Sequence, residues 1–279
     1  MQKLLQKIVP LFYGAYFNSA TYIFRQRTAK KAFLLFCTPR KGRVRPEQRS
    51  YLDSAKDAVV QYDRFSIQTY SWPKQGPTVL LLHGWESNTF RWRNLVPLLL
   101  EKGFNIVAMD APAHGNSSST TFNAPMYADC AQKIIETYDP KYIIGHSLGG
   151  MTAIYNQFKY QNKGIQKIVA LGAPSELSDF MRQYQQLLGL SKRLMGDLEQ
   201  YFISHFQMRF SDFSTPKFAK SLQVKGLLIH DELDKIAPIW SSENVHASWT
   251  GSQFIKTKGL GHSLHQDTVR QQIIDFLNS

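Results

Sequence analysis

The sequence of 279 residues predicts an α/β protein built on a doubly wound, mostly parallel β-sheet. Three observations carry this prediction. Short apolar runs of strand length alternate with segments of helical periodicity from about residue 56 onward, as in a chain of βαβ units. Glycine-containing turns follow several of these runs. The alternation stops over residues 175–223, which hold helical patterns and no strand pattern.

The predicted strands fall into two kinds. Phe65–Tyr70 alternates with a period of two, which indicates a β-strand. The other runs are mostly apolar, as expected of strands that are largely buried in a parallel sheet. They are Thr78–Leu82, Asn105–Met109, Lys141–Ile144, Ile165–Leu171, Val224–Ile229 and Phe254–Thr257.

Three segments between or after these strands have helical periodicity: Phe90–Leu100, Ala124–Thr137 and Thr268–Leu277. Gly103 closes the first of them, as is usual after a helix. Right-handed crossovers between parallel strands place such helices on both faces of the sheet. Ligand sites in these sheets lie outside the carboxyl ends of the strands.

The pattern divides the chain into three parts. Residues 1–55 form a basic, aromatic-rich helical extension, and residues 56–174 with 224–279 form the sheet core. Residues 175–223 are too long for a simple crossover and too apolar for a flexible loop. We therefore expect them to form a helical cap inserted into the core.

Charge is concentrated in the N-terminal part. Of a net charge of +12, residues 1–49 contribute eleven Lys or Arg against one acid, Glu47. Pro10 and Asn18-Ser19 interrupt the apolar run, which disfavours a signal peptide or a membrane span. Packing on the body of the protein is the first hypothesis, and peripheral contact of residues 1–50 with an anionic membrane surface is the second. Nucleic-acid binding is not expected, because no recognition module accompanies the basic residues.

A candidate nucleophile lies at Gly145-His146-Ser147-Leu148-Gly149, directly after the apolar run Tyr142-Ile143-Ile144. The pattern G-x-S-x-G between a strand and a helix is typical of a nucleophile elbow, a sharp turn that exposes the serine hydroxyl. A serine is a weak nucleophile at neutral pH, so this site needs a base, an orienting acid and donors for an oxyanion.

The preferred base is His262, which follows Gly259-Leu260-Gly261 after the last strand. Glycines on its N-terminal side allow the loop to bring a histidine back over the sheet. His265, His146 and His83 are the competing histidines. His146 is adjacent to the serine, and we expect it to be a packing residue.

The preferred acid is Asp234, in the loop beyond the strand Val224–Ile229. Asp231 lies closer to the strand end, where a turn or capping role is the competing interpretation. Glu176, after the preceding strand, is a third candidate. The chain order Ser147, Asp234, His262 is the nucleophile–acid–base order of this architecture.

Two backbone N–H groups are candidates for the oxyanion hole. The amide of Leu148 begins the helix after the nucleophile, where the helix dipole favours negative charge. The second is the amide of Trp85, because Gly84 permits a tight turn after the strand that ends at His83. The indole of Trp85 is also a candidate wall of a substrate pocket, with plain packing as the competing role.

With these residues assembled, the sequence resembles the α/β-hydrolase superfamily, in the branch with a helical cap. The resemblance covers residues 60–279 and implies a Ser-Asp-His triad. Ala113 departs from the family pattern, which has a glycine at that position. The motifs that carry the resemblance are His83-Gly84-Trp85, Asp110–Ser117, Gly145–Gly150, Asp234–Pro238 and Gly261-His262.

The resemblance implies a serine hydrolase that forms an acyl-enzyme on Ser147, with a carboxylic ester of an apolar acyl group as the expected substrate. Thioesterase, amidase, carbon–carbon bond hydrolase and acyltransferase activities use the same triad and stay open. A non-catalytic scaffold on the same fold is the alternative from another class. Relatives with an aspartate nucleophile are disfavoured, because Ser147 occupies the elbow.

Further expectations concern the substrate, cofactors and compartment. Phe180 and Tyr184 in the predicted cap are candidates to line the acyl pocket, although such residues more often join helices together. We expect a small-molecule acyl substrate and neither a metal nor an organic cofactor. Only two cysteines occur, Cys37 and Cys130, which fits a reducing compartment and predicts a cytoplasmic protein.

Overall fold

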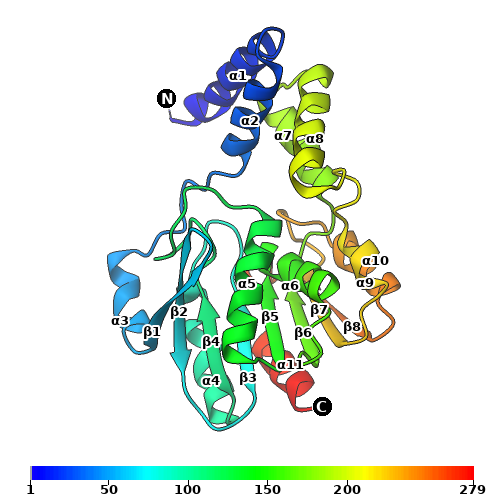
Figure 1. The fold of residues 1–279 in the computed structure, drawn as a ribbon. Helices are drawn as coiled ribbons and strands as arrows, with labels where there is room; N and C mark the ends of the chain where they lie inside the picture. The colour runs from blue at the N-terminus through cyan, green and yellow to red at the C-terminus, as the bar shows by residue number, and fades with distance from the viewer. Residues whose placement is uncertain (1) are drawn as a thin grey trace. The chain divides into compact units, whose positions relative to one another are not determined.

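A computed structural model describes the chain from residue 2 to residue 279, with side chains from residue 8 onward (Figure 1). The chain forms two compact units. A sheet unit comprises residues 39–175 and 215–279, and a helical unit comprises residues 2–38 and 176–214.

The sheet unit is built on eight strands in the order β1-β2-β4-β3-β5-β6-β7-β8. β2 is antiparallel to both of its neighbours, and every other pair from β4 to β8 is parallel. The prediction of a mostly parallel sheet is therefore confirmed. The strands are β1 (Lys56–Tyr62), β2 (Phe65–Trp72), β3 (Thr78–Leu82), β4 (Asn105–Met109), β5 (Tyr142–His146), β6 (Lys167–Leu171), β7 (Lys225–Asp231) and β8 (Ser252–Thr257).

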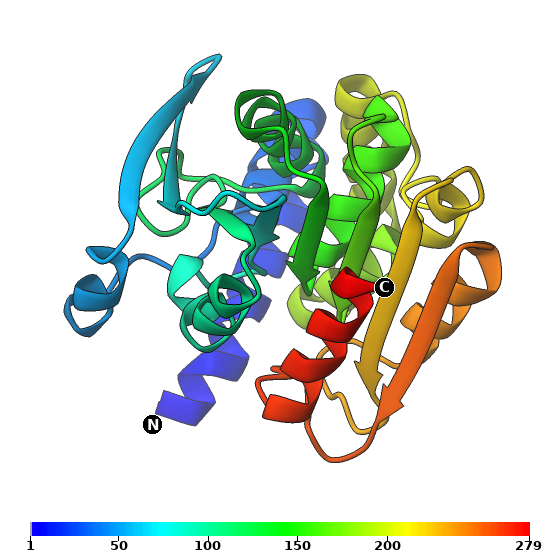
Figure 2. The same ribbon diagram turned by 90° about the horizontal axis from the view of Figure 1, so that it is seen from below.

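Helices cover both faces of this sheet, as expected of a doubly wound fold. α5 and α6 pack on one face, and α4 and α11 pack on the other (Figures 1 and 2). The helices and 3-10 turns of the unit are η1 (Pro46–Gln48), α3 (Arg49–Leu52), η2 (Thr89–Asn94), α4 (Val96–Glu101), α5 (Ala124–Tyr138), α6 (Leu148–Tyr160), α9 (Thr215–Ala219), α10 (Trp240–Ser248) and α11 (Asp267–Asn278).

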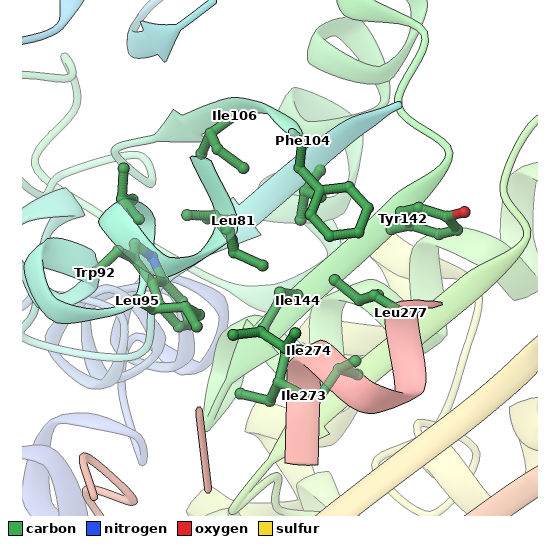
Figure 3. Close-up of a cluster of buried hydrophobic side chains, with 14 of the residues drawn as sticks. Leu81, Trp92, Leu95, Phe104, Ile106, Tyr142, Ile144, Ile273, Ile274 and Leu277 are labelled. Atoms are coloured by element: carbon green, nitrogen blue, oxygen red, sulfur yellow. The ribbon is translucent and has the colours of Figure 1, made fainter. Parts of the chain in front are cut away.

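The core on the α4 and α11 face is shown in Figure 3. Leu81, Ile106 and Ile144 from three neighbouring strands are completely buried in one cluster with the α11 residues Ile273 and Ile274. Each such side chain contributes roughly 1.5–3 kcal/mol by leaving water. This packing fixes the strands, and with them the loops at their carboxyl ends.

Several details differ from the predicted elements, among them β1 and α9, which the sequence patterns did not delimit. The helix expected over Phe90–Leu100 is split into η2 and α4 at Leu95. Pro97 is the physical reason: it lacks an N–H and therefore fits the first turn of a new helix rather than the middle of a long one. The sequence patterns also missed α10, which has no marked apolar stripe but buries Val245.

The helical unit contains α1 (Gln2–Ala20), α2 (Arg25–Phe36), α7 (Leu177–Leu188) and α8 (Lys192–Phe206). α2 packs on α8 and α1 on α7. Phe17, Phe33, Leu198 and Phe202 are buried in the shared core. Asp197 accepts hydrogen bonds from Thr21 Oγ1 at 2.7 Å and Arg25 Nε at 3.0 Å.

These boundaries differ from the expected ones. The first 38 residues form one unit with residues 176–214, whereas we expected an extension over 1–55 and a separate cap over 175–223. Residues 39–55 and 215–223 belong to the sheet unit. The helix pairs join because each buries an apolar stripe that the other completes. Within residues 2–279, no helix combines the length and the apolar character that a membrane span requires.

Candidate active site

Ser147 occupies a strained turn between β5 and α6. Its φ of 53° and ψ of −123° lie in a region that L-residues rarely adopt. Its N–H donates to the carbonyl of Leu171 on β6 at 2.8 Å. A side chain at Gly145 would run into the backbone of Gly149, so the turn requires glycine there. The sequence pattern therefore forms the elbow that it predicts.

A buried carboxylate and an imidazole lie at the ends of two neighbouring strands. His262 Nδ1 lies 2.7 Å from Asp234 Oδ2, and the side chain of Asp234 is fully buried. Asp234 Oδ1 accepts from the amides of Ile236 at 2.8 Å and Ala237 at 3.1 Å. Burial raises the pKa of Asp234, but bonds from His230, His262 and these amides outweigh it and hold the pKa below its ordinary value. Asp234 is therefore an anion that orients His262.

Several contacts link this pair to the elbow. A Cβ on Gly172 would lie 3.4 Å from His262 Nδ1 and 3.6 Å from Asp234 Oδ2. Gly172 directly follows Leu171, whose carbonyl binds the amide of Ser147. His146, the residue before the serine, donates from Nε2 to the carbonyl of His262 at 2.8 Å, and the two rings are 4.8 Å apart. The structure thus brings Ser147, Asp234 and His262 to one place.

His146 is more than the packing residue that we expected. Its ring is buried and its Nε2–H ties the His262 loop to the elbow. Burial lowers the pKa of His146 well below its ordinary value, and the charges of Arg91 and His262 act in the same direction. A neutral His146 therefore holds the loop without competing for the proton.

A second histidine, His230 at the end of β7, also contacts the acid. Its Nε2 lies 3.3 Å from Asp234 Oδ2 and 2.9 Å from the carbonyl of Ala237. Both neighbours accept hydrogen bonds only, so Nε2 carries a proton. Nδ1 lies 2.7 Å from Ser242 Oγ on α10. Sequence reasoning gave His230 no role, although its position four residues before Asp234 at a strand end was a usable signal.

Asp231, the competing candidate for the acid, binds the loop that leads to His262. Its Oδ2 accepts from the amide of Leu260 at 2.8 Å and from Thr257 Oγ1 at 2.9 Å. Its Oδ1 accepts from the amide of Leu233 at 3.0 Å. The carboxylate therefore anchors the segment that leads to His262 and does not orient the imidazole.

His265 and Glu176, the remaining candidates for base and acid, have different partners. His265 Nε2 lies 3.4 Å from Arg91 Nη1, and Arg91 also donates to the carbonyl of Ser263 at 2.6 Å. Burial lowers the pKa of His265 to about 4, aided by the nearby arginines. Glu176 belongs to the helical unit and accepts from Ser214 Oγ at 2.9 Å. The geometry therefore favours His262 as base and Asp234 as acid.

The loop after β3 is fixed by His83. Its Nε2 accepts from the amide of Ala111 at 2.9 Å, so its Nδ1 carries the proton and donates to the Gly84 carbonyl at 2.7 Å. In a trans peptide the C=O and N–H point in opposite directions, so the N–H of Trp85 faces away from His83. Gly84 adjoins the elbow, because a Cβ there would fall 2.9 Å from Ser147 Cβ.

His114, in the loop after β4, is hydrogen-bonded in turn to the loop after β3. Its Nε2 accepts from the amide of Glu86 at 3.0 Å, and its Nδ1 donates to the Pro112 carbonyl at 2.9 Å. Burial lowers the pKa of both His83 and His114 to about 4. The two neutral rings therefore brace the loop after β3 against the loop after β4.

The motif Asp110–Ser117 supports this brace. Asp110 Oδ1 accepts from the amide of Thr89, and its Oδ2 accepts from the amide of Asn116, each at 2.9 Å. Burial raises the pKa of Asp110 despite these bonds. Ala113 has a φ of 65°, in the left-handed region that glycine favours. The turn thus keeps a glycine-like conformation with an alanine in it.

The predicted substrate-contact residues lie in different surroundings. The indole of Trp85 packs edge-on against His114 at 5.5 Å. Phe180 is half-buried on α7, and Tyr184 is buried there with its hydroxyl donating to the Ala32 carbonyl at 2.9 Å. Contact of these residues with a substrate stays a prediction. Over residues 2–279, no three His, Cys, Asp or Glu side chains lie together as metal ligands would.

Known proteins are similar to parts of this chain. A family profile described as the alpha/beta hydrolase fold matches residues 77–192. A bifunctional esterase/perhydrolase of Acinetobacter calcoaceticus is 26% identical over 165 residues, which cover 57% of this chain and 59% of that protein. A soluble epoxide hydrolase of Corynebacterium sp. (strain C12) is 34% identical over 94 residues, which cover 32% of each chain. The chain therefore spans well under two thirds of these relatives.

The solved structures agree on the fold. Est1E of Butyrivibrio proteoclasticus, determined with bound ferulic acid, superposes with a TM-score of 0.66 at 15% identity, covering 80% of this chain and 100% of that one. Together with the parallel sheet, the elbow and the profile match over residues 77–192, this similarity shows that the chain has the α/β-hydrolase fold.

Proposed function

We propose that the protein is a serine hydrolase that cleaves a carboxylic ester through an acyl-enzyme on Ser147. The observation that carries the proposal is the 2.7 Å hydrogen bond between His262 and the buried Asp234, beside the strained elbow that presents Ser147. A hydroxyl at an elbow becomes a nucleophile when an oriented imidazole accepts its proton.

The proposed reaction has two halves. Ser147 Oγ attacks the ester carbonyl carbon while His262 Nε2 accepts the hydroxyl proton. The imidazolium then gives this proton to the leaving alcohol as the carbon–oxygen bond breaks. A water molecule attacks the acyl-enzyme in the same way and releases the carboxylic acid. Asp234 stays ionised throughout and stabilises the imidazolium.

We assign the oxyanion hole to the amides of Trp85 and Leu148. His83 holds the peptide between Gly84 and Trp85, which supports a fixed direction for the first donor. Leu148 is the first residue of α6, and the first amides of a helix have no acceptor within the helix. Two fixed donors stabilise the negative oxygen of the tetrahedral intermediate, and the loss of one typically costs about 10²–10³-fold in turnover.

The buried thiols do not compete with Ser147. Cys37 and Cys130 are both buried and free. Burial raises the pKa of Cys130 to about 12 and that of Cys37 further, so neither forms a thiolate nucleophile near neutral pH. Two reduced thiols also support our proposal of a cytoplasmic enzyme.

The relatives support ester chemistry, and the substrate is part of the proposal. The Acinetobacter relative is named an esterase/perhydrolase. We propose an ester with an apolar acyl group, with Trp85, Phe180 and Tyr184 as candidate contacts. A series of p-nitrophenyl esters tests this preference, and equal kcat/KM for short and long acyl chains would contradict it.

Labelling with a fluorophosphonate probe tests the nucleophile. We expect the wild-type protein to be labelled and the Ser147→Ala variant to be unlabelled, while both show the same thermal unfolding. A burst of p-nitrophenol before steady state then reports the acyl-enzyme. A folded wild-type protein that neither reacts with the probe nor cleaves esters would support the scaffold hypothesis instead.

A further inference from the structure

Helix α1 has two apolar faces, only one of which the helical unit uses. Phe17 is buried in the hydrophobic core of the unit. Val9, Phe12, Tyr13 and Tyr16 recur at the helical spacing i, i+3, i+4, i+7 and form a second, exposed face. Phe12 is 71% exposed and Tyr16 is 53% exposed. A contiguous exposed apolar stripe of this kind marks an interaction surface.

The turn between α1 and α2 continues this exposure. Tyr22, Ile23 and Phe24 are 67%, 76% and 57% exposed. The turn is not loose, because the amide of Phe24 donates to Ala20 and the amide of Thr28 donates to Phe24, each at 2.8 Å. Three consecutive large apolar side chains are thus held outward at the end of a helix pair.

Basic side chains adjoin the aromatic ones. Residues 1–38 contain six Lys or Arg and no Asp or Glu. On α2, Lys31 Nζ lies 5.9 Å from the centre of the Tyr16 ring and 3.4 Å from its hydroxyl. On α8, the guanidinium of Arg193 lies 4.6 Å from the Tyr22 ring. Positively charged side chains therefore lie over exposed aromatic rings at two places in the helical unit.

We propose that this aromatic–basic surface binds the interface of an anionic phospholipid membrane. Its side chains are those of Val9, Phe12, Tyr13, Tyr16, Tyr22, Ile23, Phe24, Arg27, Lys30, Lys31 and Arg193. Aromatic rings prefer the headgroup region of a bilayer, and lysine and arginine pair with lipid phosphates. Exposed apolar side chains with cations nearby match the acyl chains and the anionic headgroups that such an interface presents. The binding does not depend on the proposed function.

Co-sedimentation of the full chain with vesicles tests the proposal. One vesicle preparation contains phosphatidylcholine alone, and the other contains about 30% phosphatidylserine. We expect at least about tenfold stronger partition onto the anionic vesicles, and a loss of that preference as salt rises from roughly 0.1 to 0.5 M. Equal, weak partition onto both preparations would overturn the proposal.

Two variants and their matched controls place the binding on this surface. We expect Ile23→Asp with Phe24→Asp to reduce partition about tenfold or more by removing the apolar tip. Lys30→Glu with Lys31→Glu should remove the dependence on phosphatidylserine. Val59→Asp changes an exposed apolar residue of the sheet unit, and Lys102→Glu with Lys163→Glu changes exposed lysines there. Neither control should reduce partition.

A second readout separates lipid from protein as the occupant. Sedimentation velocity without lipid should show the same mass for wild type and the Ile23→Asp, Phe24→Asp variant. A dimer that this variant abolishes would instead identify the surface as a contact between two copies of the chain. Fluorophosphonate labelling of Ser147 should stay unchanged in all variants, so a failure of the catalytic proposal is distinguishable from a failure of this one.

Discussion

His230 and Asp234 form a second histidine–carboxylate contact behind the proposed catalytic pair. His230 Nε2 lies 3.3 Å from Asp234 Oδ2, the same oxygen that His262 contacts at 2.7 Å. Ser242 on α10 contacts the far side of the His230 ring at 2.7 Å. The carboxylate of Asp234 is thus contacted by two histidines, His230 and His262. Helix α10 contributes to the site through the hydroxyl of Ser242, which contacts His230.

We expect His230→Ala to lower kcat about tenfold with little change in KM, because Asp234 loses a donor and orients His262 less firmly. A carboxylate with fewer donors is more basic and favours the imidazolium, so the acid limb of kcat/KM should move to higher pH. Ser242→Ala keeps the His230 ring and should have a smaller effect. An unchanged kcat and acid limb in His230→Ala would show that the ring only fills space.

The two acids near the end of β7 should give opposite phenotypes. Asp234→Asn should lower kcat by about 10³–10⁴-fold with modest loss of stability, because the amide no longer fixes the imidazole. Asp231→Asn should lower the free energy of unfolding by about 2 kcal/mol, because its carboxylate accepts two amides and a hydroxyl. Urea unfolding and ester kinetics on both variants measure the difference. Equal kinetic losses would contradict the assignment of Asp234 as the orienting acid.

Backbone strain at Ser147 should be measurable without activity. Ser147→Gly and Ser147→Ala both lose the hydroxyl, but only glycine adopts a φ of 53° with a ψ of −123° easily. We expect the glycine variant to be about 1 kcal/mol more stable than the alanine variant. Urea unfolding of the pair gives this value. A more stable alanine variant would argue against a strained elbow.

Buried neutral histidines should make stability fall in acid. The folded chain holds the pKa of His83 and His114 at about 4, whereas an unfolded histidine has a pKa of about 6.5. Between these values the unfolded state binds more protons, so the free energy of unfolding decreases as pH falls from about 6.5 to about 4. His83, which is completely buried, contributes about 3 kcal/mol to this decrease.

Urea midpoints measured between about pH 7 and about pH 4 test this dependence. The variant His114→Gln removes one of the titrating rings and should have a shallower slope than wild type. If the urea midpoint changed with pH equally in both proteins, the protons taken up on unfolding would bind to groups other than His114.

Local sequence was sufficient for the sheet and for the elbow. Thr78–Leu82 and Asn105–Met109 were predicted from apolar runs, and the structure has strands with these same bounds. The turn at Ser147 was predicted from flanking glycines. These features depend on side-chain periodicity and on steric limits within a few residues, so they can be predicted from the sequence alone.

Tertiary structure alone decided which distant groups meet. It paired the first two helices with residues 176–214, and it used Asp231 to hold the loop of His262. Spacing in the chain favoured Asp234 over Asp231 as the acid, but it did not show which groups Asp231 would contact. Their roles differ because the fold turns one carboxylate toward backbone amides and the other toward an imidazole, and such directions depend on packing between residues far apart in sequence.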